Sequence, residues 1–254
     1  MAEAKHLKIR DLVADQAGKE VLHGISLDIE PGAVTALVGA NGAGKSSLVS
    51  VIAGVLAAKS GSISLDGRRI DGQRPDFVRR AGVAVVPEGH RILSSLTVSE
   101  NLIAAGSMWS KSELGREVAR VLALFPELVS RLDVIGSALS GGQRQMVSIS
   151  QALISRPRYL LIDELSLGLA PLIVKRIAGT LTEVAAAGVG ILLIEQFTTL
   201  ALERSRYAYV MERGKIVFEG LSAELRQRPD VLHDAYLAGG TRRDARIGTG
   251  ARRK

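Results

Sequence analysis

The chain has 254 residues, enough for one large domain or two small ones with a full-sized core. Its apolar content of 46% excludes disorder for most of its length, and the low aromatic content of 4% requires a core of Val, Ile, Leu and Ala. The absence of cysteine excludes disulfides and thiol catalysis.

The net charge of +7 is unevenly distributed. Residues 241–254 hold six basic side chains against Asp244, a net charge of +5, which leaves +2 for the rest of the chain. A nearly neutral body argues against a nucleic-acid-binding face. We expect a flexible tail that is either a solvated end or a contact for anionic lipid or another partner.

The chain start shows no apolar segment of the kind found in signal peptides. The longest uncharged stretch, residues 31–44, is too short and too rich in glycine to span a bilayer. We therefore expect a cytoplasmic protein.

Short apolar runs at 33–39, 81–87, 159–163 and 190–195 predict buried strands. Residues 97–155, between the second and third runs, have helical periodicity and begin with the capping box TVSE. After residue 190 the order is strand, helix and a hairpin over 207–220 that turns at Arg213–Gly214. This order predicts an α/β fold with a mostly parallel sheet and a helical insertion.

The motif GANGAGKS at residues 39–46 lies between a predicted strand and a helix starting near Ser46, the context expected of a phosphate-binding loop. Backbone N–H groups would surround phosphate oxygens, Lys45 would reach the β- and γ-phosphates, and the Ser46 hydroxyl would bind Mg²⁺. A glycine-rich turn without a ligand is the alternative. The candidate nucleotide-binding residues are Gly39, Asn41, Gly42, Ala43, Gly44, Lys45, Ser46 and Ser47.

Asp163 and Glu164 follow the third apolar run. An acid at a strand end suits a phosphate loop because it can hold Mg²⁺ through water, which is the role we expect for Asp163. Glu164 would then activate the attacking water as a general base. A solvated charge at the strand end is the alternative for Glu164.

The motif LSGGQ at 139–143 predicts a second anion site. Ser140 and Gln143 have the spacing of a capping box for a helix beginning at Gly141, which leaves free N–H groups beside Gly142 without bulky side chains. An ordinary helix start is the alternative.

These three motifs, in this order, resemble those of the ATP-binding subunits of ABC transporters, over roughly residues 5–240. Five segments are similar to the second-type ATPase of branched-chain amino-acid uptake systems: VPEGH (86–90), LTVSENL (96–102), SLGLAP (166–171), IEQF (194–197) and AYLAGG (235–240). The resemblance implies a RecA-like P-loop NTPase core with a mostly parallel sheet, an N-terminal antiparallel β portion and an inserted helical subdomain. It implies one nucleotide-binding domain over 1–240, with its core at about 1–90 and 156–240, its helical subdomain at about 91–155, and a basic tail at 241–254.

The resemblance also implies ATP and Mg²⁺ as cofactors and a head-to-tail dimer. ATP on Lys45 of one subunit would be covered by Ser140 and Gly142 of the other. Closure would drive two membrane permease subunits, supplied by a substrate-binding protein, so the chain would lie on the inner face of the cell membrane.

Two positions match this branch rather than the wider family. Glu88 stands where a Gln usually reaches Mg²⁺ and contacts the membrane subunit, and Gln196 stands where a switch His usually contacts the γ-phosphate. A Gln can orient water and donate to phosphate, but it carries no charge, so we expect a catalytic role for Gln196. The alternative is a polar residue that merely follows a strand.

Three features depart from the branch. Leu165 replaces a Pro, Gln151 replaces an Arg, and residues 1–76 contain no aromatic side chain to stack on adenine, where this chain has Gln16–Ala17. Because Leu frees φ and restores an N–H, we expect the turn after the acids to be loosened. Base recognition should be weak.

The resemblance therefore implies an ATP-hydrolysing subunit that powers an importer of branched-chain amino acids. Importers of urea, amides or other amino acids use closely similar subunits. A family ATPase acting on nucleic acid or ribosomes is disfavoured by the single cassette and the neutral body. A catalytically degenerate partner in a heterodimer stays open because of the three departures.

Overall fold

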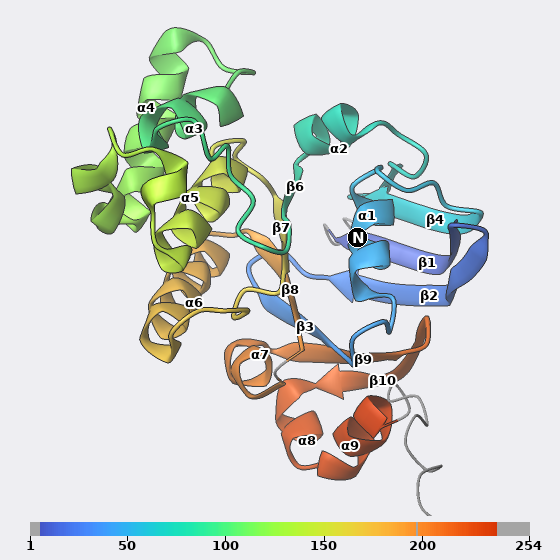
Figure 1. The fold of residues 1–254 in the computed structure, drawn as a ribbon. Helices are drawn as coiled ribbons and strands as arrows, with labels where there is room; N and C mark the ends of the chain where they lie inside the picture. The colour runs from blue at the N-terminus through green and yellow to red at the C-terminus, as the bar shows by residue number, and fades with distance from the viewer. Residues whose placement is uncertain (1–5, 197, 238–254) are drawn as a thin grey trace, which may run out of the picture.

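The centre of the molecule is a six-stranded sheet, seen in a computed structural model that describes residues 6–196 and 198–237 (Figure 1). The strand order is β10-β9-β3-β8-β7-β6; β10 pairs antiparallel with β9, and the other neighbours pair parallel. The predicted strands and hairpin are confirmed. Their bounds are β3 (Val34–Val38), β6 (Val83–Val86), β7 (Tyr159–Asp163), β8 (Gly190–Glu195), β9 (Tyr207–Glu212) and β10 (Lys215–Leu221).

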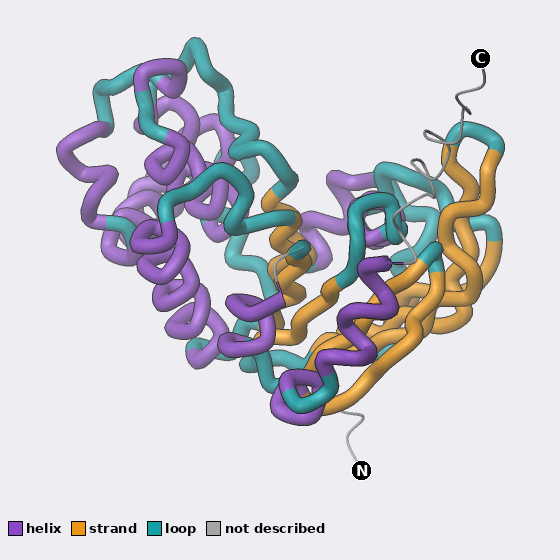
Figure 2. Tube along the Cα trace, turned by 60° about the horizontal axis from the view of Figure 1, so that its bottom comes forward, coloured by secondary structure: helices purple, strands orange, loops and turns teal. Residues whose placement is uncertain are grey.

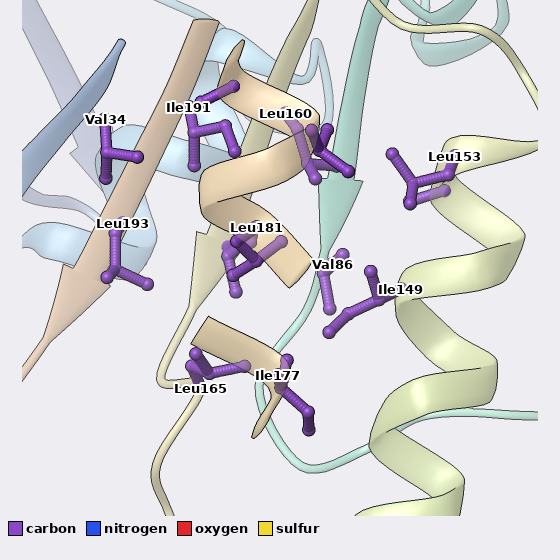
Figure 3. Packing of buried hydrophobic residues seen from close by; sticks show 14 of the residues in the cluster. Val34, Val86, Ile149, Leu153, Leu160, Leu165, Ile177, Leu181, Ile191 and Leu193 are labelled. Atoms are coloured by element: carbon purple, nitrogen blue, oxygen red, sulfur yellow. The ribbon is translucent and has the colours of Figure 1, made fainter. Parts of the chain in front are cut away.

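Both faces of the parallel strands are buried, which explains why their sequences are apolar at nearly every position. Because side chains alternate along a strand, neighbouring residues enter two different cores. In β8, Ile191 and Leu193 face the helices (Figure 3), whereas Leu192 and Ile194 face a second sheet.

The second sheet is antiparallel and has the order β2-β1-β4-β5. The core between the two sheets also receives Leu48 and Ile52 from helix α1 and Val78 from helix α2. This sheet is the N-terminal antiparallel portion that the resemblance implied. The bounds are β1 (Leu7–Gln16), β2 (Lys19–Ile29), α1 (Lys45–Ile52), β4 (Ser60–Leu65), β5 (Arg68–Arg69) and α2 (Pro75–Ala81).

Most of the helices gather on the opposite side of the six-stranded sheet, away from the antiparallel sheet (Figures 1 and 2). This group comprises α3 (Val98–Ala105), α4 (Lys111–Leu124), α5 (Gly141–Leu153) and α6 (Pro171–Ala186), with 3₁₀ helices η1 (Pro126–Arg131) and η2 (Gly136–Ala138). The chain continues through α7 (Thr198–Arg204), α8 (Ser222–Arg226) and α9 (Pro229–Leu237). Of the helices that the structure describes, none has the length and apolar character to cross a bilayer.

The two predicted capping boxes are confirmed. The Thr97 hydroxyl accepts a hydrogen bond from the Glu100 N–H at 3.2 Å, and the Ser140 hydroxyl accepts one from the Gln143 N–H at 3.3 Å. These contacts satisfy N–H groups that a helix start leaves unpaired, so they fix where α3 and α5 begin.

The parallel strands place the candidate site residues along one edge of the sheet. β3 leads into the loop 39–46, β6 leads toward Glu88, β7 ends at Asp163 and β8 ends at Glu195. Because carboxyl ends of parallel strands meet at one edge, this is where an α/β fold binds ligands. The division into a core and a helical subdomain stays a prediction, and the basic tail lies outside the described residues.

Candidate functional site

The loop 39–46 connects β3 to α1 in a shape that depends on glycine. Gly42 and Gly44 have φ angles of 78° and 106°, which L side chains rarely adopt. A Cβ at Gly44 would also lie 3.0 Å from the carbonyl oxygen of Val21. The loop therefore opens directly into the N-terminus of α1 at Lys45, where helix geometry favours an anion.

Lys45 is held inside this loop. Its side chain is buried, with 5% exposed, and its Nζ donates hydrogen bonds to the carbonyl oxygens of Gly39 at 2.8 Å and Ala40 at 3.0 Å. Burial lowers the pKa of Lys45, and the nearby carboxylates of Glu164 and Asp163 oppose that shift. A phosphate entering the loop would offer this cation a full negative charge.

Asp163 ends β7 with 5% of its surface exposed, and its Oδ1 has no hydrogen-bond partner among the described residues. Burial raises its pKa, while a hydrogen bond with Ser46 and the charge of Lys45 lower it. An unpaired buried oxygen next to a hydroxyl is a donor set that a hard cation satisfies.

Glu164 follows in a left-handed backbone conformation, with φ of 52°. Its N–H donates to the Ile194 carbonyl at 3.0 Å, which ties it to the end of β8. Burial and the charge of Glu88 raise the pKa of Glu164, and Lys45 opposes them. A carboxyl with a raised pKa facing a cavity suits a general base.

One cavity of about 500 Å³ gathers most of the predicted site residues. The lining residues come from the phosphate loop, from the ends of β6, β7 and β8, and from the antiparallel sheet: Gln16, Val21, Asn41, Gly42, Gly44, Lys45, Ser46, Ser47, Glu88, Glu164, Leu167 and Gln196. The candidates for catalysis, metal binding and phosphate binding thus line the same cavity, although two of them, Asn41 and Gln196, are 155 positions apart in the sequence.

Residues 140–143 lie apart from this cavity. Ser140 and Gln143 satisfy each other in the capping box of α5. Gly142 packs on α6, where an added Cβ would lie 2.7 Å from the Ile173 side chain, and Gly141 precedes it. Within one chain, the structure does not bring this second anion site to the phosphate loop.

Gln16 occupies the cavity wall where the sequence predicted a missing aromatic side chain. Its Oε1 accepts a hydrogen bond from the Ser47 hydroxyl at 2.8 Å. Among the described residues that line the cavity, none is aromatic. The wall beside the loop is therefore made of an amide and the Val21 side chain.

Leu165 is anchored by packing in the turn that follows the acids. Its side chain is fully buried in the core that faces the helices, near Ile177 (Figure 3). Its backbone N–H donates to the Glu195 carboxylate, which helps to lower the pKa of that group. The expectation of a loosened turn counted the freed φ and not this packing, and a difference in mobility from a proline turn stays a prediction.

Gln151, the second departure, lies outside the cavity. Its side-chain amide donates to the buried Asn101 side chain at 3.0 Å, between α5 and α3. The residue therefore contributes to packing of the helices outside the candidate site.

Two residues at this edge of the sheet were not predicted as site residues from the sequence. Glu195 ends β8 and accepts two hydrogen bonds from Ser166; its place at the end of an apolar run, like that of Asp163, was the available signal. The Tyr236 hydroxyl on α9 donates to the Gln196 carbonyl, and burial raises the pKa of Tyr236 to about 12 although the Gly39 N–H donates to it. No local pattern links position 236 to this edge.

Comparison with known proteins agrees with this geometry. Residues 22–166 match the family described as ABC transporter. The chain is 41% identical to the high-affinity branched-chain amino acid transport ATP-binding protein BraG of Pseudomonas aeruginosa, over 90% of this chain and 98% of that protein. It is 34% identical to the probable branched-chain amino acid transport ATP-binding protein LivF of Archaeoglobus fulgidus, over 81% and 87% of the two chains.

Solved structures give the same picture. The crystal structure of the ADP conformation of an ATP-binding cassette of an ABC transporter superimposes with a TM-score of 0.83 at 26% identity, covering 92% of this chain and 99% of that one. The shared fold therefore extends over nearly the whole described chain.

Proposed function

The chain belongs to the ABC transporter family as an ATP-binding subunit, in a family that hydrolyses ATP, and we propose that it powers the import of branched-chain amino acids. The observation that carries this proposal is the cavity in which the Lys45 cation, the Glu164 carboxylate and the Gln196 amide meet. The substrate is proposed from the relatives BraG and LivF, whose names state branched-chain amino acid transport.

In this proposal the loop 39–46 and Lys45 bind the phosphates of ATP. Glu164 takes the proton of the attacking water, because of the two carboxylates that line the cavity it is the one that directly follows a buried strand. Gln196 orients that water and donates to the γ-phosphate through its amide. Hydrolysis needs no covalent intermediate, so positioned groups of this kind are sufficient.

The residues present fit Mg²⁺. Asp163 offers an unpaired buried oxygen, Ser46 offers a hydroxyl beside it, and Glu88 lines the same cavity. The described residues contain no cluster of three or more acidic, His or Cys side chains that would hold a cation alone. We propose that the ion is shared with ATP, as Mg²⁺ prefers, and that when bound it neutralises phosphate charge.

We propose a head-to-tail dimer in which Ser140, Gly141, Gly142 and Gln143 of one copy cover the nucleotide of the other. The separation of this helix start from the phosphate loop within one chain supports the proposal. The N-terminus of α5 would place free N–H groups against phosphate.

An apolar groove supports docking on membrane permease subunits, the components with which ABC ATP-binding subunits work. It has a volume of about 450 Å³ and lies between α2, β6, α3 and α5, with Pro87 and Arg91 on either side of Glu88 in its wall. Val55 and Leu93 line it with 71% and 50% of their surfaces exposed. An apolar helical segment of a permease would cover them and hold the chain at the membrane.

Reconstitution tests this function. The chain is assembled in lipid vesicles with candidate permeases and a substrate-binding protein, and ATP turnover and solute uptake are measured. We expect leucine, isoleucine or valine to be taken up and to stimulate turnover, and Glu164→Gln to remove turnover while ATP still binds. Stimulation by urea, an amide or a polar amino acid instead would overturn the substrate, and bound ATP without turnover by the wild type would indicate a degenerate partner subunit.

A further inference from the structure

Glu195 is a buried acid in an unusual setting. It ends β8 with 1% of its surface exposed, and among the described ion pairs none contains it. Both carboxylate oxygens instead accept hydrogen bonds from the turn 164–166: Oε1 accepts from the Ser166 N–H at 3.0 Å, Oε2 accepts from the Ser166 hydroxyl at 2.7 Å, and the Leu165 N–H also donates to the carboxylate. Burying a carboxylate is costly, so contacts this specific indicate a fixed geometry.

The contacts of Glu195 fix the conformation of the turn that carries Glu164. The Glu164 N–H is bonded to the Ile194 carbonyl, and Ser166 is bonded to Glu195, so two successive residues of β8 hold positions 164 and 166. Leu165 between them is anchored in the core. A left-handed φ at a non-glycine residue persists only where the surroundings determine it, and Glu164 has such a φ.

The same strand end leads directly into the cavity. Gln196 follows Glu195 and lines the cavity together with residues of the phosphate loop. The end of β8 therefore holds the turn of the proposed base, and the next residue along the chain presents the proposed water-orienting amide.

We propose that Glu195 is a positioning residue for ATP hydrolysis, which holds the turn 164–166 through Ser166 and thereby aims Glu164 at the nucleotide. This inference rests on the proposed role of Glu164 as the base. Glu195 itself does not line the cavity and takes no part in proton transfer. Its removal should displace the base without removing any phosphate contact, so turnover should fall while ATP binding stays.

The test measures kcat, KM and ATP affinity for variants along this contact. We expect Glu195→Ala to lower kcat about ten- to a hundredfold, since small displacements of a reacting group have effects of this size, with ATP affinity within about twofold of wild type. Ser166→Ala should lower kcat by a smaller factor. Ser166→Thr, which keeps the hydroxyl, should have a kcat close to that of the wild type. Unchanged kcat in folded Glu195→Ala and Ser166→Ala would overturn the proposal.

Two controls separate this proposal from a general loss of stability and from failure of the proposed base. Glu117→Ala removes another buried acid, one that is paired with Arg120 and Arg156 away from the cavity, and should leave the kcat of the folded fraction unchanged. If Glu195→Ala does not fold, the kcat values of Ser166→Ala and Ser166→Thr test the positioning role instead. If Glu164→Gln is inactive and Ser166→Ala is fully active, Glu164 stays the base and only the positioning role of Glu195 is overturned. If Glu164→Gln turns over ATP at the wild-type rate, Glu164 is not the base, and the positioning role fails with it.

Discussion

At the scale of single residues, the edge of the sheet concentrates buried charge. Lys45, Asp163 and Glu195 are each at least nine-tenths buried there, and burial opposes the charged form of all three. Water would stabilise these charges better than the protein does. The fold therefore gives up stability to hold a cation and two acids where a triphosphate has to bind.

Glu195 makes this cost measurable. Burial raises its pKa from 4.5 to about 7, so between these values the unfolded chain releases a proton that the folded chain keeps. The contribution of Glu195 to stability is therefore fully present below about pH 4.5 and is lost as the pH rises through about 7, by roughly 3 kcal/mol in total. Denaturant unfolding from pH 5 to 8 should show Glu195→Gln gaining stability relative to wild type by this order.

The opposite slope serves as the control. A hydrogen bond from Arg156 holds the pKa of Glu117 below its usual value, so the contribution of Glu117 is present above that usual value and lost as the pH falls. Glu117→Gln should therefore lose stability relative to wild type only as the pH rises toward about 4.5, and its difference from wild type should stay level from pH 5 to 8. Parallel pH profiles for the two variants would contradict the assignment of the Glu195 pKa.

Base preference is also decided by a single position. Because Gln16 offers no ring to stack on, ATP and GTP should bind within about tenfold of each other. Gln16→Tyr should tighten ATP about five- to 150-fold, the range given by one stacked base. Lys19→Tyr, at the paired position of the same hairpin but outside the described cavity lining, should change nothing. Competition titration measures both, and a strong wild-type preference for ATP would reveal another contact to the base.

At the scale of elements, two helix starts form a natural matched pair. Ser110 and Ser140 both cap their helices through the same reciprocal contacts, with Glu113 and Gln143 respectively. Ser110→Ala and Ser140→Ala should each lower the free energy of unfolding by about 1 kcal/mol. Only Ser140→Ala should also remove most of the ATP turnover, because only α5 is proposed to cover a nucleotide. Equal turnover in the two variants would speak against that role for α5.

The elements also show how far sequence reasoning extends. The strands at 159–163 and 190–195 were predicted with their observed bounds, because a continuous apolar run records burial on both faces. The run at 81–87 was predicted too long, since Ala81 ends α2 and Gly82 caps it with φ of 110°. Local signals decide such elements. The motifs gave the phosphate loop and Glu164, whereas Glu88 and Gln196 came from the family resemblance, and Val21 and Leu167 of the cavity lining were not predicted.

The contacts between elements could not be predicted from the sequence. Ser166 and Glu195 are 29 positions apart and meet because β7 pairs with β8 in one register, which aligns Asp163 with Ile194. The Tyr236 contact with Gln196 likewise depends on where α9 docks. Neither the register nor the docking leaves a periodic signal, so the packing and hydrogen bonds around Leu165 were not predicted, whereas Asp163 and Glu164 were.

At the scale of the whole molecule, a cavity that contains Lys45 and lacks residues 140–143 predicts complementation between copies. Lys45→Ala and Ser140→Ala should each be nearly inactive alone. Mixed dimers would contain one intact site, made by Lys45 of one copy and Ser140 of the other, so an equal mixture should regain about a quarter of wild-type turnover if the sites act independently. ATPase assays on mixtures, compared with each variant at the same total concentration, measure this; no regain would contradict the head-to-tail arrangement.

The single tryptophan of the chain, Trp109, is an intrinsic fluorescence probe at a known position in the fold. The Trp109 indole N–H donates to the Ile154 carbonyl at 2.8 Å, and the Arg156 guanidinium lies 5.2 Å from the ring centroid, so the side chain joins the α3–α4 connection to the end of α5. Its emission consequently follows the helical side alone, whereas circular dichroism near 220 nm averages over all elements. A rearrangement within the helical side that changes the contacts of Trp109 with Ile154 or Arg156 when nucleotide binds should thus shift the emission wavelength, whereas a rigid movement of α3–α5 against the sheets should leave it unchanged.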